Sequence, residues 1–159
     1  VPFDLEKSSR FIDSGFSRLY QWHFLRTLRR KAHAKLDQFP HLADRERVQS
    51  AGTMFEYDDA MTAPVHGFRD AADYYAKSSS LHFIKSIAVP TLLLSAVDDP
   101  FLPPPVLDEV KARAAGNPHI EVEFHPRGGH VGFVAGSNPL HPIYYAEERA
   151  ADFVSQFIA

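Results

Sequence analysis

The stretch Pro90-Thr-Leu-Leu-Leu-Ser-Ala96 decides the fold of this chain. A short, continuous apolar run that opens after a proline is typical of a strand in a parallel sheet whose two faces are both covered. The run is followed by Asp98-Asp99-Pro100, where polar residues and a proline end the strand. We therefore predict a buried strand with two adjacent carboxylates at its carboxyl end.

The residues after this strand alternate between helix and strand. A helix is predicted from about Pro105 to Ala115, followed by a strand over 120–125 in which apolar and polar residues alternate. A turn with Gly128 and Gly129 then leads to His130. Strand, helix, strand is the order of a βαβ unit, so the fold class is α/β, a partial doubly wound parallel sheet. A final helix is predicted to start near Pro142 and to bury Ile143, Ala150, Phe153, Val154 and Phe157.

The first half of the chain is predicted to hold three main helices. Asp4 can cap a helix of about nine residues, and a long helix follows over 16–36, where apolar residues recur every three or four positions. Residues 39–64 show little periodicity, which predicts irregular chain with one or two short helices. A third helix is predicted from about Phe68 to Lys77. Its inward-facing residues are predicted to be Ala71, Ala72 and Tyr75.

The long helix over 16–36 has a basic face. Its cations are Arg18, Arg26, Arg29, Arg30, Lys31 and Lys35. Such a face could attract an anionic lipid surface. A solvated face is the more ordinary interpretation, because the outer side of a surface helix is normally charged.

The composition narrows the function classes. The 159 residues include 17 Lys plus Arg and 20 Asp plus Glu, so neither a nucleic-acid partner nor an acidic tail is indicated. With 45% apolar residues the chain can form a core. No apolar run reaches the roughly 18 residues of a membrane helix, and the first residues are no secretion signal. Zero cysteines exclude disulfides and a thiolate nucleophile, and favour a cytoplasmic location.

The carboxylates and one histidine follow the ends of predicted strands. Reactive groups of open α/β sheets gather beyond the carboxyl ends of the strands, which is where Asp98, Asp99 and His130 fall. If the two strands are neighbours, a carboxylate and the imidazole can meet. A carboxylate at Nδ1 fixes the imidazole tautomer and stabilises the imidazolium that forms when Nε2 accepts a proton. The other eight histidines are predicted to be ordinary surface or core residues.

Two motifs around these residues resemble a known family. Ser95-Ala-Val-Asp-Asp-Pro-Phe-Leu-Pro103 and Arg127-Gly-Gly-His-Val-Gly-Phe133 are similar to the acid and histidine motifs of the YheT-like α/β-hydrolases, relatives of animal α/β-hydrolase-domain lipases and esterases. The likeness extends over nearly the whole chain. Its further segments are Pro2-Phe-Asp-Leu5, Gly15-Phe-Ser-Arg18 and Tyr57-Asp-Asp-Ala-Met-Thr-Ala-Pro-Val-His-Gly-Phe68.

The resemblance implies a division of the chain and a role for each part. Residues 1–159 would form a single partial α/β-hydrolase domain, in which 4–80 are a helical cap-like region and 81–159 are the last two core strands and the C-terminal helix. It implies a carboxylic ester hydrolase with Asp99 and His130 as the acid and histidine of a Ser-Asp-His triad. Its substrate would be a small-molecule ester or a lipid-like ester, and it needs no cofactor and no metal.

Two parts of this assignment depart from the family pattern or stay open. Asp99 is preferred as the acid because it directly precedes Pro100, and Asp98 is the alternative, which could instead brace the turn. The chain has no Gly-x-Ser-x-Gly run. Gly136-Ser137-Asn138 lacks the second glycine and follows the histidine, whereas this fold orders its triad serine, acid, histidine. We therefore expect the nucleophile to lie upstream of Val1, and the isolated chain to be inactive.

Three further expectations follow. A non-catalytic binding or interaction module, derived from a hydrolase fold, is the main alternative function, because fold alone does not assign function. A metal hydrolase is a weaker alternative, since no His-Glu-x-x-His or His-x-His spacing is present. Finally, the apolar strand over 90–96 would be left with an exposed edge, which predicts association with the missing N-terminal half or with a second copy.

Overall fold

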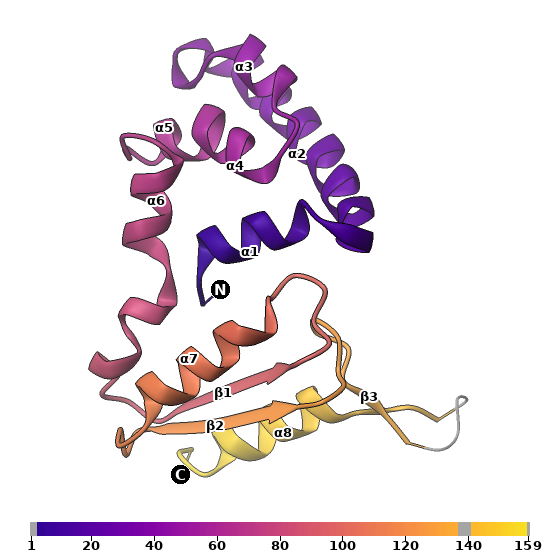
Figure 1. Ribbon diagram of the computed structural model, residues 1–159, viewed down its shortest axis with the longest axis vertical. Coiled ribbons are helices and arrows are strands. Elements are labelled where there is room, and N and C mark those ends of the chain that lie inside the picture. The colour runs from indigo at the N-terminus through magenta and orange to yellow at the C-terminus, as the bar shows by residue number, and fades with distance from the viewer. Residues whose placement is uncertain (1–2, 137–140, 159) are drawn as a thin grey trace. The chain divides into compact units, whose positions relative to one another are not determined.

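The computed structural model describes residues 3–136 and 141–158. The chain forms two compact units, Val1–Ser80 and Leu81–Ala159, each of which has its own secondary structure (Figure 1). Among the described helices, none is both long enough and apolar enough to cross a membrane. Pro2 of the family motif, and Ser137 and Asn138 of the incomplete glycine-serine run, lie outside the described residues.

The first unit begins with two helices close to the predicted positions. Helix α1 (Leu5–Ile12) starts after Asp4, whose carboxylate accepts a hydrogen bond from the amide of Lys7 at 2.9 Å. This bond satisfies one of the free amides of the first turn. Gly15 has a φ of +56°, a left-handed conformation that interrupts the helical path. Helix α2 (Arg18–Gln38) follows and is the longest of the described helices.

The prediction of mostly irregular chain over 39–64 is wrong, because most of this segment is helical. Its short elements start at side-chain caps that periodicity does not reveal. Asp44 accepts hydrogen bonds from two amides of the next helix, and Thr53 and Glu56 form a reciprocal capping box. The elements are α3 (Arg45–Ser50), α4 (Met54–Tyr57), a π-helical turn (Asp58–Thr62) and α5 (Ala63–Val65).

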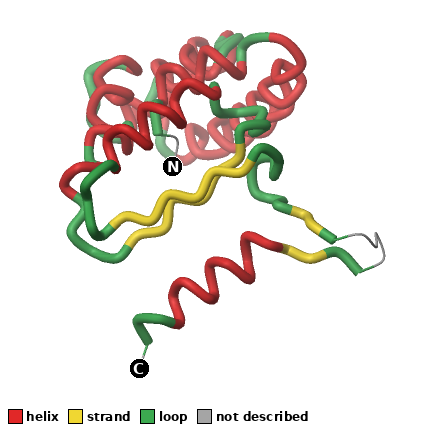
Figure 2. Tube along the Cα trace, turned by 60° about the horizontal axis from the view of Figure 1, so that its bottom comes forward, coloured by secondary structure: helices red, strands yellow, loops and turns green. Residues whose placement is uncertain are grey.

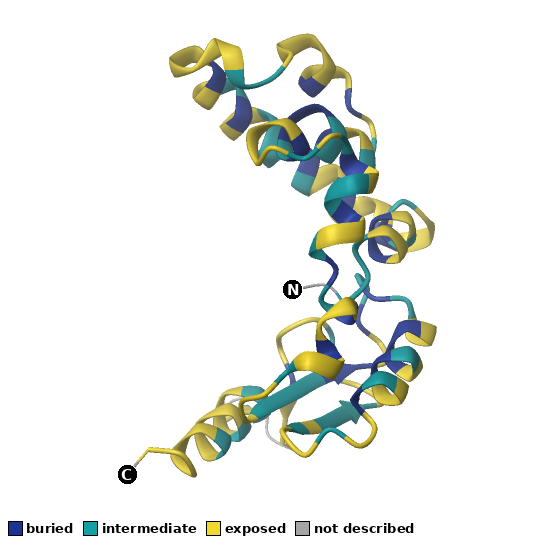
Figure 3. Cartoon of the chain, turned by 90° about the vertical axis from the view of Figure 1, so that its left-hand side faces the viewer, coloured by how far each residue is buried: buried dark blue, intermediate teal, exposed yellow. Residues whose placement is uncertain are grey.

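The core of the first unit forms where α2 meets these short helices. The inward side of α2 supplies Leu25, Ala32 and Leu36, which are at most 3% exposed. They contact buried side chains of the following segment, so the buried positions in Figure 3 concentrate on the inner sides of these helices. The partners are Val48, Ala51, Tyr57, Ala60 and Met61.

Helix α6 (Ala71–Ser78) completes the first unit. It begins three residues later than predicted because Asp70 is its cap, accepting a hydrogen bond from the amide of Asp73 at 2.7 Å. Ala71 and Tyr75 are buried as predicted. Ala72 is exposed, so its predicted inward position is wrong.

The second unit is built on a strand–helix–strand segment. Strands β1 (Thr91–Ala96) and β2 (Ile120–His125) are parallel and paired along their whole length, and α7 (Pro104–Ala114) connects them. Figure 2 shows the two strands side by side. The fold is therefore part of an α/β sheet, as predicted.

The register aligns the ends of these strands. Thr91 lies opposite Ile120 and Ala96 lies opposite His125. The amide of Val97 then donates to the carbonyl of His125 at 2.8 Å, which continues the ladder by one bond. The chain therefore leaves both strands at the same edge of the sheet.

The end of the chain differs from its prediction. The final helix, α8 (Tyr145–Ser155), begins at Tyr145 and has no buried residue among those described. Ile143 instead belongs to β4 (Ile143–Tyr144), which pairs antiparallel with β3 (Val134–Ala135). The predicted burial is wrong at four of the five positions: Ile143, Ala150, Val154 and Phe157 are exposed and Phe153 is half-buried.

The polar side chains of β2 bind residues of α8, although Glu121 stays exposed and Glu123 is only partly buried. Arg149 of α8 donates to Glu123 at 2.8 Å and also to Glu121, and the Tyr145 hydroxyl donates to Glu123. His125 contacts the same Glu123 carboxylate at 2.6 Å. The polar residues that alternate along β2 therefore form a hydrogen-bonded network with α8.

Candidate active site

The carboxylates of the predicted pair lie directly beyond β1, in a turn that holds them in different directions. The amide of Asp99 donates to the carbonyl of Ala96 at 3.3 Å, and the carboxylate of Asp99 accepts from the amide of Phe101 at 2.8 Å. An aspartate that bonds to the amide two residues later fixes its own turn. Asp99 is 7% exposed, whereas Asp98 is exposed.

Asp99 and His130 are in contact. His130 Nδ1 lies 2.9 Å from Asp99 Oδ2, although 31 residues separate the two in the chain. Since an ionised carboxylate only accepts hydrogen bonds, the contact places the proton of the neutral imidazole on Nδ1. Nε2 is then the ring nitrogen that remains for proton transfer, and 53% of the His130 side chain is exposed.

Asp98 does not address the imidazole. Its Oδ1 accepts hydrogen bonds from the amides of Gly128 and Gly129, at 2.9 and 2.8 Å. These glycines form the turn that carries His130. The two neighbouring carboxylates therefore have different partners. Asp98 binds the backbone of the histidine loop, and Asp99 binds the imidazole of His130.

Besides Asp98, the side chain and backbone of Phe133 also shape the histidine loop. It is 6% exposed and has a φ of +40°, the one non-glycine residue with positive φ in the described chain. Its amide donates to the carbonyl of Gly128 at 2.9 Å, which closes the loop around His130. A Cβ at Gly128 would lie 2.7 Å from the Phe133 ring, so this position accepts only glycine without a shift.

The close approach in the histidine loop is at Gly128 and not at Gly132. The sequence suggests that Gly132, after the histidine, allows a close backbone approach. The nearest atoms to a Cβ at Gly132 lie 3.8 Å away, which leaves room for a side chain. The close approach is at Gly128, where the aromatic ring of Phe133 folds back on the turn.

An aromatic ring adjoins the imidazole. The centroids of Phe101 and His130 are 4.7 Å apart, with the ring planes at 72°. This edge-to-face contact limits the rotation of the imidazole and gives it an apolar neighbour. Phe101 and Phe133 are the site residues that sequence reasoning missed, although both lie inside the two motifs that carry the family resemblance.

The remaining carboxylates and histidines of the described chain are arranged differently from Asp99 and His130. Within residues 3–136 and 141–158, no three side chains of the His, Asp or Glu type come together as metal ligands. Asp58 and Asp59, the other carboxylate pair, bind groups of their own unit. Asp58 accepts from the hydroxyls of Tyr75 at 2.7 Å and Thr62 at 2.6 Å. Asp59 accepts from Arg47 and from the amide of Ala71, the first residue of α6.

Two parallel strands joined by a helix, with an aspartate and a histidine in contact beyond their shared carboxyl edge, agree with part of an α/β-hydrolase fold. The chain belongs to the α/β-hydrolase superfamily.

Three curated relatives give this membership its sequence basis. The chain is 36% identical over 160 positions to "Putative esterase YheT" of Escherichia coli (strain K12), covering 99% of this chain and 46% of that protein. It is 31% identical to "Monoacylglycerol lipase" of Saccharomyces cerevisiae over 83% of this chain and 30% of that protein. It is 29% identical to "Phospholipase ABHD3" of Mus musculus over 79% of this chain and 30% of that protein.

The chain thus spans from under a third to just under half the length of these relatives. No family model matches the chain. No solved structure matches it either.

Proposed function

We propose that this chain contributes the acid and the base of a Ser-Asp-His triad in a carboxylic ester hydrolase, with Asp99 as the acid and His130 as the base. The observation that carries the proposal is the 2.9 Å contact between His130 Nδ1 and Asp99 Oδ2 at the common end of two parallel strands. The names of the relatives, an esterase and two lipases, support the ester as the substrate class.

The proposed chemistry is acyl transfer to water. A serine hydroxyl attacks the ester carbonyl while His130 Nε2 accepts its proton, and the imidazolium then gives this proton to the departing alkoxide. Water attacks the acyl-enzyme by the same route, and serine is regenerated. Asp99 keeps Nε2 unprotonated in the resting state and stabilises the imidazolium when it forms.

The nucleophile is proposed to lie upstream of this chain. The 159 residues contain no Gly-x-Ser-x-Gly run, and the triad order of this fold places the serine before the acid. The same proposal assigns residues 4–80 to a cap-like region and 81–159 to the last part of the catalytic core. The cytoplasmic location inferred from composition stays a prediction.

Exposed apolar side chains of the second unit support a partner for it. Val154 and Phe157, on and just after α8, are 50% and 56% exposed, and Val97 beyond β1 is 45% exposed. We propose that an N-terminal half of the same protein, or a second copy of this chain, covers them. Light scattering on the 159-residue chain tests the second copy, since a strict monomer at all concentrations would contradict self-association; a monomer that also failed to bind a separately expressed N-terminal half would contradict both.

A fluorophosphonate probe tests the triad directly. Such a probe phosphonylates only a serine that a neighbouring base activates. We expect the full-length protein to be labelled and its His130→Ala variant to lose labelling, while His125→Ala, which removes a histidine outside the proposed triad, keeps it. Labelling of the His130→Ala variant at the wild-type rate would overturn the role of His130.

The isolated chain offers a second test. We expect purified residues 1–159 not to hydrolyse a p-nitrophenyl ester, because the proposed nucleophile is not among them. Turnover by this chain would refute the upstream serine. A full-length protein without a Gly-x-Ser-x-Gly run would instead favour the non-catalytic binding module.

A further inference from the structure

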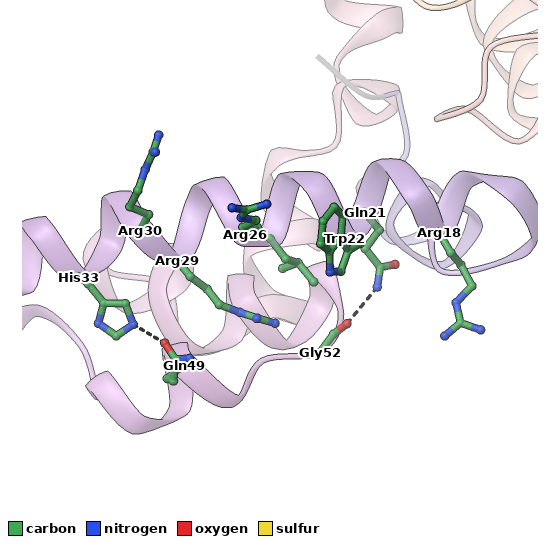
Figure 4. A pocket seen from close by; sticks show the side chains of 10 residues that line it. Arg18, Gln21, Trp22, Arg26, Arg29, Arg30, His33, Gln49 and Gly52 are labelled. Carbon is green, nitrogen blue, oxygen red and sulfur yellow. Dashed lines mark hydrogen bonds between the residues drawn. The ribbon is translucent and has the colours of Figure 1, made fainter.

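The first unit contains a groove that none of the proposed ester chemistry uses. It lies along one side of α2, against the segment over 49–52, and has a volume of about 450 Å³ (Figure 4). Arg18, Trp22, Arg26 and Arg29 line it from the helix. Among the described residues that line it, none is Asp or Glu.

The arginines of this groove differ from the other arginines of the same unit. Each of those other arginines pairs with a carboxylate at 2.9 Å or less; the pairs are Arg10–Glu6, Arg45–Asp37, Arg47–Asp59 and Arg69–Asp70. In the described residues, Arg18 and Arg26 have no carboxylate within ion-pair distance, and Arg29 donates instead to the carbonyl of Ala51. Positive charge without an ion-paired carboxylate is therefore concentrated on this side of α2, where the charge of Arg18 also acts to lower the pKa of Asp13.

Two residues that line the groove each have a buried polar atom with no hydrogen-bond partner among the described residues. These atoms are Nε of Arg29, a donor, and Oε1 of Gln21, an acceptor. Gln21 is 7% exposed, and its other amide atom, Nε2, donates to the carbonyl of Gly52 at 2.9 Å, which fixes the direction of Oε1 (Figure 4). Buried polar groups normally bind a partner, so each of these atoms would be satisfied by a ligand group of the opposite kind once a side-chain movement opens it to the groove.

We propose that this groove binds a phosphate ester that carries a neighbouring hydroxyl group, as in glycerol phosphate. The phosphate oxygens would accept hydrogen bonds from Arg29 and lie in the positive field of Arg18 and Arg26, because guanidinium groups match phosphate geometry. The hydroxyl donates to Gln21 Oε1. Trp22, which is 62% exposed beside the groove and 5.7 Å from the Arg26 guanidinium, contacts the carbon skeleton.

Two kinds of ligand carry these groups: a phospholipid headgroup and a free phosphate ester. The proposal does not depend on Asp99 or His130, so it can fail while the triad stands. It also replaces the interpretation of the basic face as merely solvated, because a solvated face needs neither a groove nor buried atoms that lack partners.

The test compares two pairs of substitutions on the same helix, in the full-length protein. Arg18→Gln with Arg26→Gln removes two charges from the groove. Lys31→Gln with Lys35→Gln removes two charges from exposed positions of α2 that do not line it. Binding is measured by calorimetry with glycerol 3-phosphate, and by sedimentation with vesicles of phosphatidylglycerol in phosphatidylcholine, at physiological salt so that general surface attraction is screened.

We expect the arginine pair to weaken binding about 10-fold or more, because two charge-assisted contacts are lost. The lysine pair should weaken it less than about threefold. A loss in both the calorimetric and the vesicle experiment identifies the free ester as sufficient, and a loss with vesicles alone identifies the lipid headgroup. Equal losses for the two pairs, or no binding of either probe, would overturn the proposal.

A ligand-side comparison tests the hydroxyl without changing the protein. Methyl phosphate has the same charge as glycerol 3-phosphate but no hydroxyl to donate to Gln21. We expect it to bind several-fold more weakly, since a buried acceptor stays unsatisfied. Equal affinities would remove Gln21 from the site and with it the neighbouring hydroxyl that the proposal requires.

Discussion

The chain carries two aspartate pairs, and their surroundings differ. Asp58 and Asp59 lie in the π-helical turn of the first unit, and bind hydroxyls, a guanidinium and a backbone amide. Asp98 and Asp99 follow a strand of the second unit, and bind two glycine amides and the imidazole of His130. In both pairs, neighbouring carboxylates have separate partners.

The partners decide what each pair can do. A hydroxyl, an amide and a guanidinium keep their protons near neutral pH, so the Asp58–Asp59 pair can only hold structure. An imidazole gains and loses a proton in this range. The dipeptide Asp-Asp therefore carries no function by itself, and the pair that contacts His130 is the one to test for catalysis.

The largest expected effect is that of Asp99→Asn in the full-length protein. An amide at this position can stabilise the wrong imidazole tautomer, so we expect kcat on a p-nitrophenyl ester to fall about 10⁴-fold. The matched substitution Asp59→Asn in the other pair should change kcat less than about threefold. Similar effects of the two substitutions would contradict the distinction between a catalytic and a structural pair.

The second effect is on the stability of the first unit. Asp58→Ala leaves the hydroxyls of Tyr75 and Thr62 without their acceptor, and Tyr75 is 2% exposed. We expect a loss of about 2 kcal/mol in the free energy of unfolding, together with faster amide hydrogen exchange over residues 58–78. Asp58→Asn keeps an acceptor and should stay close to wild type. An Asp58→Ala variant as stable as wild type would show that the hydroxyls find other partners.

The third effect is that of substituting Asp98. It distinguishes a carboxylate that binds the histidine loop from one that binds the imidazole. Asp98→Ala removes the acceptor of the Gly128 and Gly129 amides, so we expect His130 to be less well positioned and kcat to fall about 10-fold with little change in KM. Asp98→Asn retains a side-chain oxygen and should restore most of the rate. If Asp98→Asn is as impaired as Asp99→Asn, then Asp98 acts on the imidazole and not through the loop.

The sequence predicted the second unit better than the first. The strand over 120–125 follows from the alternation of apolar and polar residues, and the turn before His130 follows from its glycines; both are local signals. The fold-back of Phe133 onto Gly128 is a contact between side chain and turn, and no local pattern encodes it. The division between Asp98 and Asp99 likewise depends on which way each carboxylate leaves the turn.

The errors elsewhere have two physical causes. The helices over 45–65 are short and are stabilised by caps such as Thr53 with Glu56, so periodicity over a long window overlooks them. At the C-terminus, the apolar spacing of α8 predicts burial, but the helix has no buried residue among those described. The side that α8 turns to β2 instead carries Tyr145 and Arg149, which bind glutamates.

The same contrast between the units predicts opposite responses to acid. Partial burial disfavours the charge of Glu123, but hydrogen bonds from Tyr145, His125 and Arg149 outweigh it and lower its pKa to about 2 from 4.5. Burial raises the pKa of Asp58 above 3.8, although bonds from Thr62 and Tyr75 oppose the rise. One carboxylate is held ionised by its unit, and the other is held closer to its neutral form.

The sign of each contribution follows from proton binding in the folded and unfolded states. Between pH 4.5 and about 2 the unfolded chain binds more protons at Glu123 than the folded chain, so this contribution to stability is lost as the pH falls through that window. Asp58 has the reverse sign: above pH 3.8 the folded chain binds more protons there, so acidification stabilises the folded state.

Substituting Glu123 or Asp58 isolates its contribution to the pH dependence of stability, because the other carboxylates titrate alike in variant and wild type. Between pH about 5 and about 3, we expect the urea midpoint of Glu123→Gln to fall less than the urea midpoint of wild type. Over the same interval, the urea midpoint of Asp58→Asn should fall more than that of wild type. This pH effect is the smallest of the four effects predicted for these carboxylates, since Glu123 is partly exposed and solvent screens its partners. Parallel curves for Glu123→Gln and wild type would mean that the network under α8 adds nothing to stability, and that the helix is held by other contacts.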